Sequence, residues 1–235
     1  MSGMRTRMTI VGIVLAAVAA ALGVVALLML ALGPWAGLGA GALGAAAVLV
    51  AYRLVAQPWQ HRWGATDEEV AAVLPGDGLI PDATGSTTRA IAIAAPPERV
   101  WPWLVQLGYG RAGWYSYDWI DNDGRRSADR VVPELQDLRV GDQILMLPGT
   151  GPRVRAIEPG RFLLAGDVEG GTWCLALRAA AGGTRLVSRW RVRWPLTPAT
   201  AFWTLLSDPG AFVMERRMLK GIKARAERAA ALAGV

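Results

Sequence analysis

The sequence predicts an α+β protein in which an antiparallel sheet and a long C-terminal helix follow an N-terminal transmembrane helical hairpin. Three observations support this fold class: residues 8–52 carry no charge, residues 143–194 form short strand-like runs between glycine- and proline-containing turns, and residues after 208 have a helical apolar period. We therefore divide the chain into a hairpin at 1–56, a linker with a short helix at 57–86, and a globular domain at 87–235.

The hairpin has two apolar stretches, at residues 8–32 and 36–55. The first has 25 residues and would extend about 37 Å as a helix, which exceeds the ~30 Å hydrocarbon core of a bilayer. Gly33 and Pro34 break the helix, and Trp35 suits a membrane interface. A cleaved signal peptide is the alternative, but its apolar region is usually only about 7–15 residues long.

Basic residues set the expected orientation of this hairpin. Arg5 and Arg7 precede it, Arg53 and Arg62 follow it, and the turn has no positive charge. Because positive flanks remain on the cytoplasmic side, we expect a multi-pass cell-membrane protein with both termini and the domain in the cytoplasm. Neither span contains an ionisable residue, which argues against transport or proton relay.

Small residues favour close helix packing in the second stretch. Gly37, Gly41 and Ala45 recur every four positions on one helix face. Their partner is either a second copy of the chain, giving a homodimer, or the first helix of the same chain, through Ala16, Ala19, Ala20 and Gly23.

Charge and composition exclude several function classes. The formal net charge of +6 includes four arginines beside the hairpin, which leaves +2 elsewhere, so nucleic-acid binding is not expected. Cys174 is the only cysteine, which excludes an intramolecular disulfide. His61 is the only histidine and lies in the linker. That position argues against a Ser-His-Asp triad, a Cys-His pair or a histidine metal site, and we expect no metal and no cofactor.

Local signals define the elements from residue 66 to residue 108. Thr66 and Glu69 have the spacing of a capping box and predict a short helix. Alternating residues then predict a strand whose one face carries Thr87, Arg89, Ile91 and Ile93. Pro97 suits the first turn of the helix that follows, and Gly108 ends it.

Five further strands are predicted at residues 143–147, 153–158, 161–167, 172–178 and 184–194. In the last strand, one face carries Ser188 and the tryptophans and should point inward. The opposite face should point outward, and its basic residues are Arg185, Arg189, Arg191 and Arg193. That row is either a solvated face, which we favour, or a patch that meets anionic lipid.

The C-terminal region predicts two helices. A short one covers residues 198–206, and Asp208 with Pro209 then resembles the capped start of a long amphipathic helix.

A family resemblance rests on the strand and helix at 87–108, the following GWYSYDW segment (113–119), and the downstream SADR (127–130) and PELQ (133–136) segments. This part of the chain resembles the START-like superfamily, also called SRPBCC, which includes polyketide cyclase/dehydrase-like proteins. The resemblance extends from about residue 63 to residue 230. It implies a helix-grip fold, in which the C-terminal helix lies across a curved antiparallel sheet and encloses a hydrophobic cavity.

The resemblance implies a domain that binds an apolar small molecule or lipid as a carrier, sensor or presenter, and the hairpin with its flanking arginines predicts that this domain is cytoplasmic and anchored at the lipid bilayer. The candidate ligand contacts are aromatic and charged residues of the expected cavity and its covering loop, together with one methionine: Trp103, Trp114, Tyr115, Tyr117, Asp118, Trp119, Arg130, Glu134, Trp173, Trp190, Phe212 and Met218. The structural alternative is that Asp118 or Glu134 pairs with Arg130 and the aromatic side chains pack as a lid, which holds the long loop without contacting a ligand.

Two alternatives remain open. A cyclase/dehydrase-like enzyme would use Asp118 or Glu134 as a base, with Tyr115 or Tyr117 polarising a carbonyl, and would bring a carboxylate and a tyrosine together at the cavity. A non-binding membrane scaffold would fill the cavity with Trp173, Trp190 and other large side chains.

Overall fold

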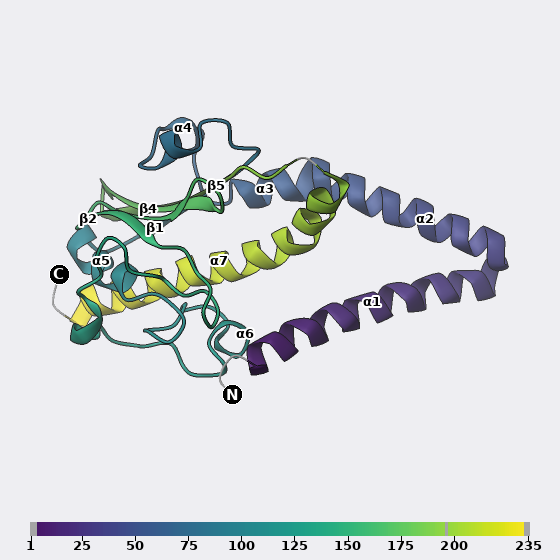
Figure 1. The fold of residues 1–235 in the computed structure, drawn as a ribbon, viewed down its shortest axis with the longest axis horizontal. Helices are drawn as coiled ribbons and strands as arrows, with labels where there is room; N and C mark the ends of the chain where they lie inside the picture. The colour runs from purple at the N-terminus through teal and green to yellow at the C-terminus, as the bar shows by residue number, and fades with distance from the viewer. Residues whose placement is uncertain (1–3, 196, 233–235) are drawn as a thin grey trace. The chain divides into compact units, whose positions relative to one another are not determined.

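The computed structural model describes residues 4–195 and 197–232. It separates into two compact units, Met1–Gln60 and His61–Val235, which are described in turn. Figure 1 shows the elements of both.

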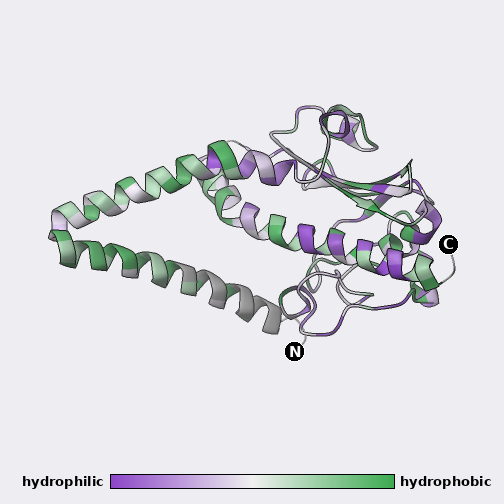
Figure 2. Cartoon of the chain, turned by 180° about the vertical axis from the view of Figure 1, so that it is seen from behind, coloured by the Kyte–Doolittle hydropathy of each residue, from purple (hydrophilic) through white to green (hydrophobic). Residues whose placement is uncertain are grey.

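The first unit is helical. It contains α1 (Met4–Leu32) and α2 (Pro34–Ala51), and α2 continues through a π-helical turn, η1 (Tyr52–Ala56), into α3 (Gln57–His61). Gly33 separates α1 from α2 and has a positive φ of 86°. Among the described residues, Pro34–His61 is long and apolar enough to cross a membrane, and Val18–Leu32 is a shorter apolar helix. Figure 2 shows the hydrophobic colouring of α2. The side chains of Arg5 and Arg7 lie outside the described part.

Two of the small residues of α2 face α1 of the same chain. A Cβ atom on Gly37 would lie 2.4 Å from the backbone of Met29, and one on Gly41 would lie 3.2 Å from the side chain of Val25. Ala45 is exposed. Gly37 and Gly41 therefore contact the first helix of the same chain, which is the intrachain alternative. The residues of α1 nearest to them are Met29 and Val25, and not the predicted alanines and Gly23.

The second unit is built on a five-stranded antiparallel sheet in the order β1-β5-β4-β3-β2. Its strands are β1 (Gly85–Ile93), β2 (Val154–Glu158), β3 (Phe162–Asp167), β4 (Gly171–Ala180) and β5 (Gly183–Val192). The strand predicted at 143–147 is wrong. Only isolated bridges form there, Gln143 with Arg153 and Leu147 with Thr150, because Pro148 and Pro152 cannot donate to a ladder.

One face of the sheet packs against two helices, α5 (Pro97–Val105) and α7 (Pro198–Leu232). Leu186 of β5, Trp103 of α5 and Ile222 of α7 belong to one buried apolar cluster. Figure 2 shows hydrophilic and hydrophobic bands alternating along α7, as expected for a helix with one buried side. This sheet with a long C-terminal helix across it agrees with the predicted α+β architecture.

The C-terminal region is one helix and not two. α7 runs through Pro209, at which the prediction started a second helix. Proline removes one backbone hydrogen bond but does not end this helix, and α7 bends in its N-terminal part (Figure 1). Phe212 and Leu219, which follow the proline, are buried.

The other face of the sheet is covered by residues 64–82, so the prediction that its arginines face solvent or lipid is wrong for Arg185, Arg189 and Arg191, whereas Arg193 remains exposed. The covering segment contains α4 (Asp67–Ala71), with the expected capping box between Thr66 and Glu69, and a 3-10 turn, η2 (Asp77–Leu79). Arg189 is only 4% exposed and donates hydrogen bonds to Thr88, to Asp77 and to three backbone carbonyls of residues 69–72.

The neighbouring arginines hold the same segment. Arg185 forms two hydrogen bonds to Glu69, at 2.8 and 2.7 Å, and Arg191 donates to the carbonyl of Ile80. Arg193, at the end of the row, pairs with Asp82. These arginines therefore hold residues 64–82 against the sheet, because the covering segment supplies carboxylates and carbonyl oxygens in place of water.

Candidate functional site

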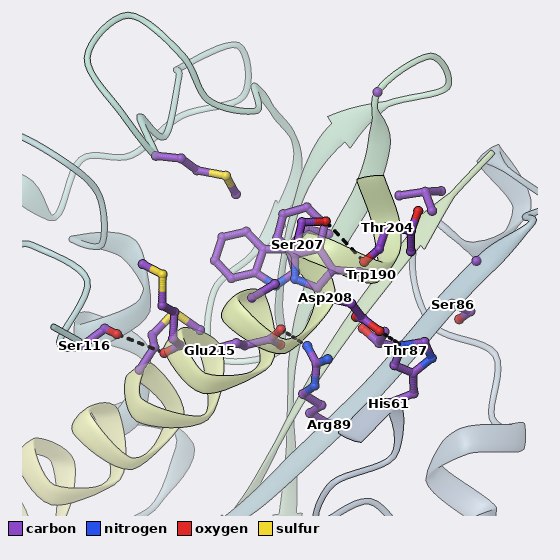
Figure 3. A pocket seen from close by; sticks show the side chains of 18 of the residues that line it. His61, Ser86, Thr87, Arg89, Ser116, Trp190, Thr204, Ser207, Asp208 and Glu215 are labelled. Atoms are coloured by element: carbon purple, nitrogen blue, oxygen red, sulfur yellow. Dashed lines mark hydrogen bonds and ion pairs between the residues drawn. The ribbon is translucent and has the colours of Figure 1, made fainter. Parts of the chain in front are cut away.

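A cavity of about 430 Å³ is lined by residues of β1, β4, β5 and α7 and by parts of the loops between β1 and β4. Figure 3 shows the side chains around it, with Trp190 from the sheet and Glu215 from α7 both directed toward it. The volume lies within the ~300–1,000 Å³ range of small-molecule pockets.

Tryptophans form a continuous aromatic wall of this cavity. Trp173 of β4 and Trp190 of β5 are directly paired in the sheet register, and their rings stack 5.0 Å apart with an interplanar angle of 9°. Trp114 lies against Trp173 with a centroid distance of 5.8 Å. The indole N–H of Trp173 donates to Ser188 Oγ at 2.9 Å, which fixes the orientation of the ring.

A buried ion pair crosses from the sheet to α7. Arg89 of β1 is 2% exposed and donates to Glu215. Ser188 Oγ donates to the other oxygen of Glu215 at 2.6 Å. The Arg89 guanidinium also lies 5.4 Å from the centre of the Phe212 ring. Arg89 and Glu215 line the cavity (Figure 3), and the strand alternation had already placed Arg89 on the same face as Ile91 and Ile93.

His61 also lines the cavity, contrary to the expectation that the linker holds it outside the domain. Its Nε2 atom lies 2.7 Å from Oδ2 of Asp208 on α7 (Figure 3). α3 ends at His61, so the chain enters the second unit beside the start of α7. Ser207 is adjacent in sequence, but its hydroxyl donates to the carbonyl of Trp203, as helical serines often do, so a hydrogen-bonded Ser-His-Asp arrangement is not present here.

Asp121 is the least expected residue of the site. It ends the short helix α6 (Asp118–Asp121), lines the cavity and is 3% exposed. Burial raises the pKa of its carboxyl group to about 7, and the charge of Asp118 adds to the rise. The Ser116 hydroxyl and the backbone amides of Tyr117 and Asp121 lower the pKa by less. No local sequence signal distinguishes the burial of this aspartate from that of Asp118 and Asp123.

The structure brings together four of the twelve predicted contact residues, since Trp114, Trp173, Trp190 and Met218 line the cavity. The other eight do not line it. Trp103, Tyr115 and Phe212 are buried in the packing around it, Tyr117 and Asp118 are half-buried, and three are exposed: Trp119, Arg130 and Glu134. The lining residues that the prediction omitted include His61, Arg89, Asp121, Met146, Met214 and Glu215.

The loop residues bind one another in place of forming an acid-base pair. Asp118 accepts hydrogen bonds from the backbone N–H of Ser127 at 3.0 Å and from its hydroxyl at 2.5 Å, so Asp118 holds the loop without Arg130. Tyr115 accepts from Gln106 at 2.8 Å, and burial raises the pKa of its phenol to about 12. The cyclase/dehydrase-like alternative required Asp118 or Glu134 to meet a tyrosine at the cavity, and these contacts do not include such a pair.

Metal and thiol chemistry find no support in the described part of the chain. No group of three or more histidine, cysteine, aspartate or glutamate side chains is placed to hold a metal ion there. Cys174 packs with Leu74 and Val187 on the arginine side of the sheet, and burial raises the pKa of its thiol to about 12. It is therefore a structural residue.

Comparisons with known proteins give only distant similarities. No family model and no curated protein matches the chain. Protein SSP2350 from Staphylococcus saprophyticus is 12% identical, with a TM-score of 0.39 over 61% of this chain and 92% of that chain. The polyketide_cyc-like protein Cgl2372 from Corynebacterium glutamicum is 18% identical, with a TM-score of 0.29 over 59% and 88%. DynU16, a protein of the dynemicin biosynthetic locus, is 17% identical, with a TM-score of 0.33 over 57% and 46%.

Proposed function

We propose that the unit His61–Val235 is a START-like, helix-grip domain that binds an apolar small molecule or lipid, and that the helical hairpin anchors it at the cytoplasmic face of a membrane. The observation that carries the proposal is the cavity of about 430 Å³ with its wall of Trp114, Trp173 and Trp190. Burial of apolar ligand surface would drive binding, at roughly 25 cal/mol per Å².

The position of the tryptophans supports binding over a scaffold role. A scaffold would use Trp173 and Trp190 to fill the space between the sheet and α7. Their rings instead stack on each other, and the cavity remains beside them.

The test is native mass spectrometry of the full-length protein in mild detergent, followed by extraction and identification of what it carries. We expect one apolar molecule per chain. Met214→Trp should reduce that occupancy at least about fivefold, because Met214 lines the cavity and the larger ring would occupy it. Val213→Trp is the matched control, since Val213 is 47% exposed and does not line the cavity. Full occupancy of the Met214→Trp protein, or empty wild-type protein, would count against the proposal.

The proposed anchoring has support from α7 as well as from the apolar stretch Pro34–His61. His61 ends that stretch and contacts Asp208 of α7. One turn earlier, Phe202 and Trp203 are 65% and 63% exposed. Exposed aromatic side chains of this kind suit a membrane interface, and Thr204 and Ser207 of the same turns line the cavity. The cavity would then open near the bilayer that stores its ligand.

Cysteine labelling tests the proposed topology. On intact cells, Trp35→Cys should react with a membrane-impermeant maleimide, because the proposed topology puts Trp35 at the outer turn and its side chain is 84% exposed. Asp129→Cys, at an exposed position of the domain, should react only after permeabilisation. Cys174 should give little background, because burial raises its thiol pKa to about 12. Labelling of Asp129→Cys on intact cells would show that the domain lies on the outer side of the membrane, which contradicts the proposed topology.

A further inference from the structure

The cavity wall contains a buried carboxylate, that of Asp121, which the fold compensates only in part. Both carboxylate oxygens of Asp121 are inaccessible and lack a hydrogen-bond partner of normal geometry among the described residues. Buried polar groups in native proteins are nearly always paired, and a buried carboxylate is among the most costly to leave unpaired. A group retained under these conditions at a cavity wall points to a ligand that supplies the missing donors.

The other charges of the cavity favour a cation over an anion. Among the described residues, Arg89 is the only arginine or lysine that lines the cavity, and its guanidinium already donates to Glu215. His61 is in contact with Asp208. Three carboxylates, those of Asp121, Asp208 and Glu215, thus share the cavity with one guanidinium and one imidazole. An entering carboxylate would face this acidic excess, whereas an ammonium group would reduce it.

The aromatic wall is compatible with the same ligand. The stacked pair of Trp173 and Trp190 presents a flat apolar surface, and indole faces attract both planar apolar groups and cations. Met146, Met214 and Met218 add flexible apolar side chains, which adapt to ligands of irregular shape. The cavity therefore combines one buried acceptor with an extended apolar lining.

We propose that the cavity selects a hydrophobic amine, whose ammonium group donates hydrogen bonds to Asp121 while its apolar body packs against Trp114, Trp173 and Trp190. This inference rests on the proposed binding function and specifies its ligand class. The near-neutral pKa of about 7 for Asp121 is consistent with it, because a bound ammonium group would hold the carboxylate in its charged form at neutral pH.

The test uses three probes that differ only in their polar group: 1-naphthylmethylamine, 1-naphthylmethanol and 1-naphthoic acid. Each is measured by equilibrium dialysis against full-length protein in lipid nanodiscs, with empty nanodiscs as the blank. We expect the amine to bind at least about tenfold more tightly than the alcohol, and the acid to bind most weakly. Asp121→Asn should remove the amine's advantage and change the alcohol's affinity by less than about threefold.

Two control variants separate the possible outcomes. Asp137→Asn should behave as wild type, because Asp137 is 73% exposed, pairs with Arg139 and does not line the cavity. Met214→Trp should weaken all three probes. Binding of the alcohol as tight as that of the amine, or an amine preference that survives Asp121→Asn, would overturn the amine inference and leave the binding function intact. If Met214→Trp weakens the binding of none of the three probes, the proposed binding of apolar molecules in this cavity is itself contradicted.

Discussion

Replacing Glu215 by alanine should lower the free energy of unfolding by about 3–5 kcal/mol, the typical cost of leaving a buried charge without its partner. Arg89 is 2% exposed and could not regain water after the loss. Ser188 would also lose the acceptor to which its hydroxyl donates. In thermal unfolding followed by tryptophan fluorescence, this corresponds to a decrease in Tm of roughly 6–20 °C.

Two further variants test the physical reason. The double replacement Arg89→Met with Glu215→Leu removes both charges and should recover most of the lost stability, because apolar side chains of similar size avoid the desolvation cost. Glu158→Ala is the control, since Glu158 pairs with Arg161 at the surface and such pairs contribute about 0–1 kcal/mol. Equal melting of Glu215→Ala and Glu158→Ala would show that the buried pair contributes little.

Replacing Asp121 by asparagine should stabilise the protein at pH 8 and not at pH 4. Folding raises the pKa of this carboxyl group from 3.8 to about 7, so the folded state binds the proton more tightly than the unfolded state does. Stability from this group is therefore fully present below about pH 4 and decreases as the pH rises toward 7.

Asparagine carries no charge and lacks this dependence. The full linkage would be about 4 kcal/mol, but partial solvent screening and the unpaired amide reduce it, and we expect about 2 kcal/mol. The Tm of Asp121→Asn at pH 8 should then exceed that of wild type by roughly 4–8 °C. At pH 4 the two proteins should melt together, and Asp137→Asn should change little at either pH. A Tm difference independent of pH would exclude the linkage.

These two predictions concern residues that differ in how far sequence could identify them. Strand alternation placed Arg89 on the face of Ile91 and Ile93, which is the face that packs against α5 and α7. Its partner lies 126 residues away, and nothing in the pattern around Glu215 connects the two. Asp121 had no signal at all, because its burial depends on the fold of the loop that contains it. The sequence analysis therefore identified the tryptophans of the candidate site but missed most of its polar residues.

The sequence by itself determined the elements whose causes are local. The capping box of Thr66 and Glu69, the alternation in β1 and β5, and the proline that starts α5 depend on residues a few positions apart, and each formed as expected. Local patterns also indicated the apolar helices of the first unit.

Only the tertiary structure decided which charges are buried and what they contact. Arg185, Arg189 and Arg191 look solvent-exposed by periodicity, yet residues 64–82 cover them, and His61 looks like part of a linker, yet it lines the cavity. The physical reason is that the free energy of a charged group depends on partners distant in sequence, whose carboxylates and carbonyl oxygens replace the water it loses.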